Sequence, residues 1–333
     1  MKNVNFLFVV LLLWNCSEAE KETCVFSPDL SATELVVDFE HFEDTLANIK
    51  SKEALKAFLT RQPMIRDEML RRPEYPNDSV FLEEMFKRFS NPAIDTLLIE
   101  TKNVFGNLAT LESQFKSAFA HIQHYYPDFI PPSIKTVITG LDTDLFVSDS
   151  LIIVSLDFFL GPHATFRPKT YDYLLRRYDP EDIVISSLLL YGISDRFNKT
   201  DLKDKTVLAE MITYGKSFYF AKHMLPCTPD SLLIWYTDEE IRGARENENL
   251  IWARFIQDKV LFSTSMMEKK NYLGDRPVTT QVGEKCPGRI GQWVGWQVVK
   301  KYMQAHPDRS LPELMNMDNA QLLFKGSQYK PKK

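Results

Sequence analysis

Residues 134–154 read IKTVITGLDTDLFVSDSLIIV, and they decide the fold because strand-like patterning is concentrated there. Apolar and polar residues alternate over Ile134–Thr139, which is the period of a half-buried strand. Gly and Asp residues typical of a turn follow at 140–144. The runs Leu145–Val147 and Leu151–Val154 then indicate two further short strands. The stretch therefore predicts a small β-sheet.

Helical patterns surround this stretch on both sides. From about Glu34, apolar residues recur at helical steps through Phe39 and Ile49, and Phe105–Tyr126 predicts a long amphipathic helix. Between them stand prolines that predict short helices, namely Pro63, Pro73, Pro76 and Pro92. Beyond the strands, helical patterning continues to Tyr302, and the apolar run Val184–Tyr191 indicates a buried helix. We expect an α+β fold that is predominantly α-helical.

Composition narrows the class of protein. With 44% hydrophobic and 26% charged residues the chain has the make-up of a folded protein. Forty basic against 45 acidic side chains give a net charge of −5, which disfavours nucleic acid as a partner. Four cysteines in 333 residues cannot form a disulfide-dense scaffold. We expect one helix-rich domain over 31–325 and a polar basic tail at 326–333.

The N-terminus indicates export and a lipid anchor. One Lys precedes the apolar run Phe6–Trp14, which is too short to cross a bilayer and has the layout of a signal peptide over 1–15. Leu13-Trp-Asn-Cys16 resembles a bacterial lipobox, so we expect acylation of Cys16 and a tether over 16–30. The alternative is an ordinary secretory peptide with an incidental cysteine. We expect a lipid-anchored protein of the cell envelope, facing the periplasm or the cell surface.

Known catalytic and metal-binding patterns are missing from the sequence. It contains no HExxH, G-x-S-x-G, Walker A or G-x-G-x-x-G pattern. His121 and His124 are three residues apart on a predicted helix, where surface or capping roles suit them. Export permits a disulfide, but the spacing of Cys24, Cys227 and Cys286 does not select a pair. We predict no catalytic residue, no metal site and no cofactor.

Two late segments hold polar side chains in apolar surroundings. Glu210 lies in an apolar helical stretch and is expected to pair with Lys216 or Arg289, or to be exposed. After Pro287, glycines recur at steps of three and four residues, which predicts a helix whose small face lets another backbone approach, with Trp293 and Trp296 packed nearby. Arg289 opposes the helix dipole there, so we expect a salt bridge or a ligand contact.

These segments together resemble a known family, the gliding-motility lipoprotein GldB of Bacteroidetes, along essentially the whole mature chain. The resemblance is carried by Val37–Glu40, Ser155–Gly161, Tyr214–Lys216, Glu248–Trp252 and Pro287–Trp296. Members of that family are implicated in gliding and in type IX secretion, and no enzymatic activity is firmly attached to them. The resemblance implies a membrane-anchored protein whose partners are other gliding and secretion proteins of the envelope.

A more distant similarity connects the chain to predicted zinc peptidases. The order of a small sheet, an apolar helix, a Glu-containing helix and a glycine-rich terminal helix implies a degenerate zincin-like architecture. In those proteins an HExxH motif occupies the apolar helix, which corresponds here to Asp182–Ser194 and contains no His or Glu. Glu210 would then mark the neighbourhood of the third metal ligand.

Two hypotheses of function follow. In the first, the protein is a noncatalytic envelope lipoprotein that acts through protein interactions, with a pocket formed by Glu210, Tyr214, Lys216, Arg289 and Trp293. Tyr214, Lys216, Arg289 and Trp293 could instead serve core and helix packing, and Glu210 could form a structural ion pair. In the second, the protein is an envelope metallopeptidase-like hydrolase with a non-standard site.

Overall fold

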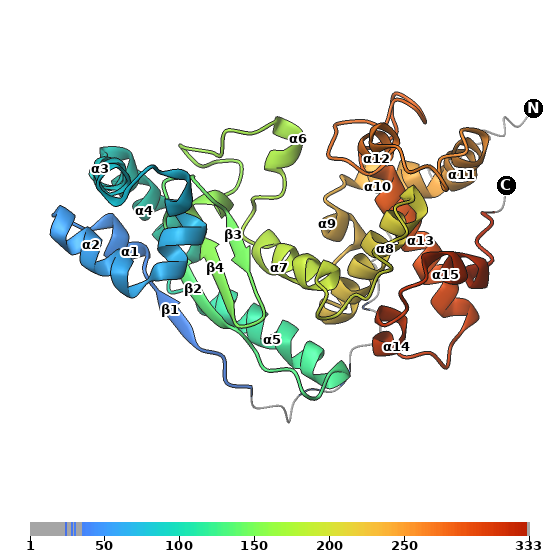
Figure 1. Ribbon diagram of the computed structural model, residues 1–333, viewed down its shortest axis with the longest axis horizontal. Helices are drawn as coiled ribbons and strands as arrows, with labels where there is room; N and C mark the ends of the chain where they lie inside the picture. The colour runs from blue at the N-terminus through green and yellow to red at the C-terminus, as the bar shows by residue number, and fades with distance from the viewer. Residues whose placement is uncertain (1–23, 25–27, 29, 31–34, 332–333) are drawn as a thin grey trace, which may run out of the picture.

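Pairing between distant segments builds the sheet at the centre of the molecule. A computed structural model describes residues 24, 28, 30 and 35–331 (Figure 1). The strands are β1 (Phe39–His41), β2 (Ser133–Val137), β3 (Leu145–Val147) and β4 (Leu151–Ser155), in the spatial order β1-β2-β4-β3. β1, β2 and β4 run parallel, while β3 is an antiparallel edge strand. The three strands that the sequence predicted are confirmed.

The expectation of helix at Phe39 is wrong. Phe39 pairs with Ile134 in the β1–β2 ladder, and the helix that follows, α1 (Glu43–Ala47), is short. The apolar spacing around Phe39 is compatible with a helix, but long-range pairing with β2 determines its conformation. Local periodicity does not contain that information.

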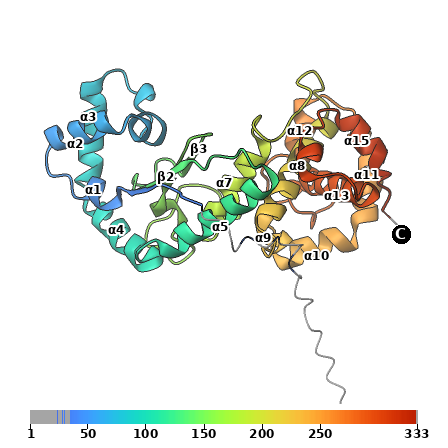
Figure 2. The same ribbon diagram turned by 90° about the horizontal axis from the view of Figure 1, so that it is seen from below.

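The two faces of the sheet contact two separate hydrophobic cores. Alternate residues of β4 point in opposite directions, as the pleat requires. Ile152 and Val154 belong to the larger core, which the C-terminal helices complete. Ile153 belongs to a smaller core formed with the helices before β2. Figures 1 and 2 show these N-terminal helices at one end of the molecule and the last helices at the other.

The N-terminal helices are longer than the prolines predict. They are α2 (Lys52–Arg61), α3 (Asp78–Phe89) and α4 (Pro92–Phe105), with a π-helical turn over Ile65–Met69 and a 3₁₀ turn over Arg72–Glu74. Pro92 stands at the start of α4, where the missing N–H costs no hydrogen bond. The expectation of short helices was therefore wrong for α3 and α4. The long amphipathic helix is confirmed as α5 (Ala109–Tyr125).

The remaining helices follow the sheet. They are α6 (Asp172–Leu175), α7 (Asp182–Ile193), α8 (Val207–Met224), α9 (Asp230–Ile234), α10 (Asp238–Glu246), α11 (Glu248–Gln257), α12 (Met266–Tyr272), α13 (Ile290–Ala305), α14 (Leu311–Met315) and α15 (Ala320–Ser327), and a 3₁₀ turn covers Leu156–Phe159. α7 is the buried helix that the sequence predicted. None of the helices in the described ranges has the length and apolar character needed to cross a membrane.

The glycine-rich segment after Pro287 does what its spacing predicts. A Cβ built on Gly295 of α13 would lie 1.9 Å from the carbonyl oxygen of Met211 in α8. A Cβ on Gly215 of α8 would lie 2.4 Å from the carbonyl oxygen of Gly295. The two helix backbones therefore touch, and Trp293 and Trp296 are fully buried beside them.

The two ends of the chain are joined to this body. A disulfide links Cys24 to Cys227, just after α8, and Cys286 is a free thiol. At the other end, α15 continues to Ser327 and the hydroxyl of buried Tyr329 donates to Glu248. Folded structure therefore extends past the boundary expected at residue 325. The predicted signal peptide and Cys16 lie outside the described residues.

Candidate functional site

A cleft of about 400 Å³ opens between the sheet and the C-terminal helices. Leu145 of the edge strand β3 lies on one side. α7 forms a wall through Leu190 and Ile193, and α8 forms the floor through Tyr214. Arg177, which follows α6, and Trp235, which follows α9, complete its lining. We call this site the cleft.

The apolar wall of the cleft comes from α7. Ser186, Leu189, Leu190 and Ile193 are spaced by three or four residues, so they share one face of the helix. The helix is apolar on all sides, because its other faces pack in the larger core. On the cleft side, however, Leu190 is 47% exposed and Ile193 is 37% exposed. Exposed aliphatic side chains in a concave site are typical of a binding surface.

The polar end of the cleft is organised around Trp235. The guanidinium of Arg177 lies 4.8 Å from the centre of the Trp235 ring, and that of Arg289 lies 5.3 Å from it. Asp275 pairs with both arginines: its carboxylate accepts from Nη1 of Arg177 at 3.2 Å and lies 3.5 Å from Nε of Arg289. One carboxylate therefore serves two guanidinium groups.

Burial shifts the pKa values of Arg289 and Asp182, which lie next to Trp235. Desolvation lowers the pKa of Arg289 to about 10, and the charge of Arg177 acts in the same direction. Asp182, at the start of α7, accepts a 2.9 Å hydrogen bond from Nε1 of Trp235. Desolvation raises the pKa of Asp182 to about 7, despite the hydrogen bonds from Trp235 and the Asp179 backbone that oppose the shift.

The structure does not gather the five side chains predicted from the sequence into one pocket. Tyr214 lines the cleft, and burial raises the pKa of its hydroxyl. Arg289 lies behind Trp235, only 5% exposed, and its Nη2 donates to the carbonyl of Ile234 at 2.5 Å. Trp293 is a core residue. Lys216 and Glu210 face a different cavity.

That second cavity, of about 170 Å³, is lined by α8 and by residues around Lys199 and Met317. Nζ of buried Lys216 donates to the carbonyls of Lys199 and Met317 at 2.7 Å and contacts that of Met315 at 3.3 Å. Glu210 pairs with Lys269 instead of Lys216 or Arg289, so the expected partners were wrong. Lys269 comes from α12, whose position against α8 could not be read from the sequence.

The positions of α7 and Glu210 can be compared with the expected remnant of a zinc site, in which Glu210 would mark the third-ligand neighbourhood beside α7. Ser186 and Leu190, four residues apart on α7, face the cleft together with Tyr214. Glu210 lies in the second cavity, so it does not mark a third-ligand position beside α7. Within the part of the chain that the structure describes, no three His, Cys, Asp or Glu side chains are grouped closely enough to hold a metal ion. Nδ1 of His121 lies 2.8 Å from the Ser117 carbonyl, and the ring of His124 packs on Tyr125.

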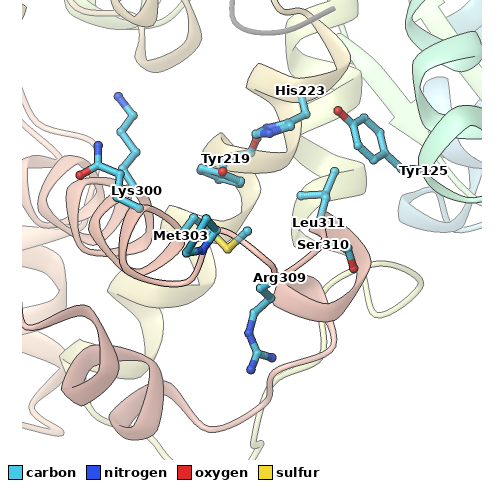
Figure 3. Close-up of a pocket in the computed structure, with 10 residues that line it drawn as sticks. Tyr125, Tyr219, His223, Lys300, Met303, Arg309, Ser310 and Leu311 are labelled. Carbon is cyan, nitrogen blue, oxygen red and sulfur yellow. The ribbon is translucent and has the colours of Figure 1, made fainter. Parts of the chain in front are cut away.

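A third cavity, of about 420 Å³, lies where α5, α8, α13 and α14 meet (Figure 3). Tyr125 faces Tyr219 and His223 across it, while the charged ends of Lys300 and Arg309 extend away from its centre. Burial lowers the pKa of His223, so its neutral form is favoured, and its Nδ1 contacts the Tyr219 carbonyl at 2.8 Å. This cavity therefore has aromatic rings on the side of α5 and α8, and Met303, Ser310 and Leu311 on the side of α13 and α14.

Two side chains that line the cleft, Arg177 and Trp235, were not predicted from the sequence. Arg177 belongs to the pair Arg176-Arg177, and this concentration of positive charge is a weak signal, since the chain also holds Arg71-Arg72. Trp235 gives no such signal. It follows α9 with a left-handed backbone, at a φ of 53°, and only the tertiary structure brings its ring close to two arginines from distant segments.

The fold and the cleft define a helix-rich α+β protein with a cleft of about 400 Å³ beside an edge strand. Comparison with protein families then identifies the group to which it belongs. The model of the family "Gliding motility protein GldB" matches residues 23–331. The chain is thus a member of the GldB family of gliding-motility lipoproteins. No curated protein and no solved structure matched in the corresponding searches.

Proposed function

We propose that the protein is a noncatalytic, membrane-anchored envelope lipoprotein that supports gliding motility and type IX secretion by holding a segment of another envelope protein in the cleft. The observation that supports this most strongly is the edge strand β3 beside an exposed aliphatic wall. Edge strands accept an extended peptide through backbone hydrogen bonds, and neighbouring pockets select its side chains.

The hydrogen bonds of β3 show which residues face the open edge. The amide of Ser155 donates to the carbonyl of Asp144, and the amide of Ser148 donates to that of Leu151, both at 2.9 Å. Since bonding alternates along an antiparallel pair, the backbone groups of Leu145 and Val147 point away from β4. No further strand of the described chain pairs with that edge. The carbonyl of Leu145 therefore lies at the open edge beside the apolar wall, while the Leu145 amide donates to Oδ1 of Asp144 at 2.8 Å.

The anchor is the second part of the proposal. Acylation of Cys16 would hold the protein at the membrane, and the Cys24–Cys227 disulfide fixes the chain to the body eight residues later. The body would then work at the membrane surface, within reach of other anchored envelope proteins.

Blocking the cleft in cells tests this function. Leu190→Glu places a charge on the aliphatic wall, at a side chain that is already 47% exposed. Leu322→Glu is the matched control, because Leu322 is 60% exposed on α15 and lines none of the cavities described above. We expect Leu190→Glu to abolish gliding and to reduce type IX cargo in the medium at normal protein abundance, while Leu322→Glu does neither. Equal behaviour of the two variants would reject the proposal.

The alternative function is an envelope hydrolase with a non-standard metal site. It makes a different prediction, because a metallohydrolase purifies with its metal or regains activity when metal is added. Metal analysis of the purified lipoprotein separates the two functions. Stoichiometric zinc would favour the hydrolase over the binding protein.

A further inference from the structure

We infer that Arg177 makes the cleft specific for a peptide segment that carries a carboxylate, either at its C-terminus or on an Asp or Glu side chain. The inference deepens the proposed function, since it assumes that the cleft holds a protein segment. It is carried by the distribution of charge and hydrogen bonds at the polar end of the cleft.

Two arginines beside Trp235 share a single ion-pair partner. Arg176 has a carboxylate of its own, because Glu240 accepts from both of its terminal nitrogens, at 2.6 and 3.3 Å. Arg177 and Arg289, in contrast, share Asp275. The Asp275 side chain is 45% exposed, so solvent weakens its contribution to both pairs. Within ion-pair distance, the two guanidinium groups therefore have one partly exposed carboxylate for both.

Arg177 also has unused hydrogen-bonding capacity. Its Nε is buried and has no hydrogen-bond partner in the described structure. Its terminal nitrogens are directed to Asp275. A guanidinium carries five N–H donors in a fixed fork, so a ligand oxygen in the cleft can accept from the terminal N–H groups that do not face Asp275, because the Arg177 side chain is 21% exposed.

The rest of the site holds Arg177 ready for such a contact. The face of Trp235 supports its guanidinium, and the Nε1 hydrogen bond to Asp182 fixes the Trp235 ring. The Arg177 side chain retains 21% exposure, whereas that of Arg289 retains 6%. Arg177 can therefore touch a ligand, and Arg289 adds positive potential from behind.

The other two acids near the cleft, Asp144 and Asp182, accept hydrogen bonds from groups other than Arg177. Asp144 accepts from the Tyr178 hydroxyl at 3.1 Å and from the Leu145 amide at 2.8 Å. Asp182 accepts from Trp235 and from the Asp179 amide, and burial favours its neutral form. A carboxylate brought by a ligand is the group that completes the site.

Binding of three synthetic peptides to the full-length lipoprotein in detergent, measured by fluorescence anisotropy, tests the inference. All three are based on the β-prone sequence Thr-Val-Thr-Val-Leu and carry an N-terminal dye. The first ends in a free carboxylate, the second in an amide, and the third in an amide with Glu replacing the central Thr. We expect the first or the third to bind at least about tenfold tighter than the second. Which of the two binds tells a C-terminal carboxylate from an acidic side chain.

Two variants of the protein should change the preference for a carboxylate-bearing peptide in opposite directions. Arg177→Gln should remove the preference for carboxylate, whereas Asp275→Asn should strengthen it by removing the competing carboxylate. Arg309→Gln is the matched control, because Arg309 lies over Tyr302 and away from the cleft. If all three peptides bind with equal affinity and Arg177→Gln does not change it, this inference is overturned while the proposed function still stands. Failure of every peptide to bind would overturn the proposed function together with it.

Discussion

Replacing Gly295 by Ala tests the helix contact on which the floor of the cleft rests. An Ala Cβ at this position would lie 1.9 Å from the Met211 carbonyl oxygen, whereas ordinary van der Waals contact begins at 3.4 Å. The neighbour is backbone, so α8 and α13 would have to separate. Overpacking of this kind costs about 1–3 kcal/mol.

The sign of the effect makes this prediction diagnostic. In a helix without such a contact, Gly→Ala gains up to about 1 kcal/mol. Gly243 of α10 is the matched control, because a Cβ there meets nothing within 4 Å. We expect Gly295→Ala to lower the free energy of unfolding by about 2 kcal/mol and Gly243→Ala to raise it by about 0.5–1 kcal/mol.

Urea unfolding followed by circular dichroism measures both changes. Gly215→Ala meets the same backbone from the other helix, so the double variant Gly215→Ala, Gly295→Ala should lose less than the sum of the single losses. If Gly295→Ala proves as stable as the wild type, the backbones of α8 and α13 do not touch as described and the reasoning is refuted.

Two further predictions concern the disulfide and the buried lysine. Cys227→Ser should lower the free energy of unfolding by about 2–5 kcal/mol, because the disulfide joins residues 203 positions apart in the sequence. In this variant, urea unfolding should be the same with and without reductant. A urea midpoint equal to that of the wild type would contradict the disulfide. Burial lowers the pKa of Lys216 from 10.5 to about 7, so the unfolded state binds more protons between these values. The contribution of Lys216 to stability should therefore rise from pH 7 toward 10.5 and be lost as the pH falls through 7. The difference in unfolding free energy between the wild type and Lys216→Met should change accordingly between pH 7 and 9, and a constant difference would exclude this titration.

The parts of the fold that the sequence predicts are those set by local patterns. Alternation in 134–154 yields β2, β3 and β4, and the glycine spacing after Pro287 yields a helix that another backbone can approach closely, although it does not identify α8 as that partner. β1 was missed because its pairing with β2 depends on a contact between distant segments. The Cys24–Cys227 bridge was left open for the same reason, since spacing does not report the distance between two Cα atoms.

The candidate site divides in the same way. Tyr214 lies in the cleft, and Arg289 lies directly behind it. Glu210 and Lys216 share α8 with Tyr214 but line another cavity. Glu210 is four residues before Tyr214 and so lies one turn away along the helix, whereas Lys216 is two residues after Tyr214 and points to a different side. Arg177 and Trp235 come from loops, whose geometry follows from the packing of the elements that they connect.

Site-specific crosslinking in living cells tests the central claim most directly. A photoreactive p-benzoylphenylalanine at position 190 lies on the aliphatic wall of the cleft, and one at position 322 lies on α15 as a control. We predict a discrete adduct with an envelope protein at position 190, absent at 322 and diminished when Arg177→Gln is added. No adduct at position 190, or the same adducts at both positions, would contradict the claim that the cleft holds a partner segment.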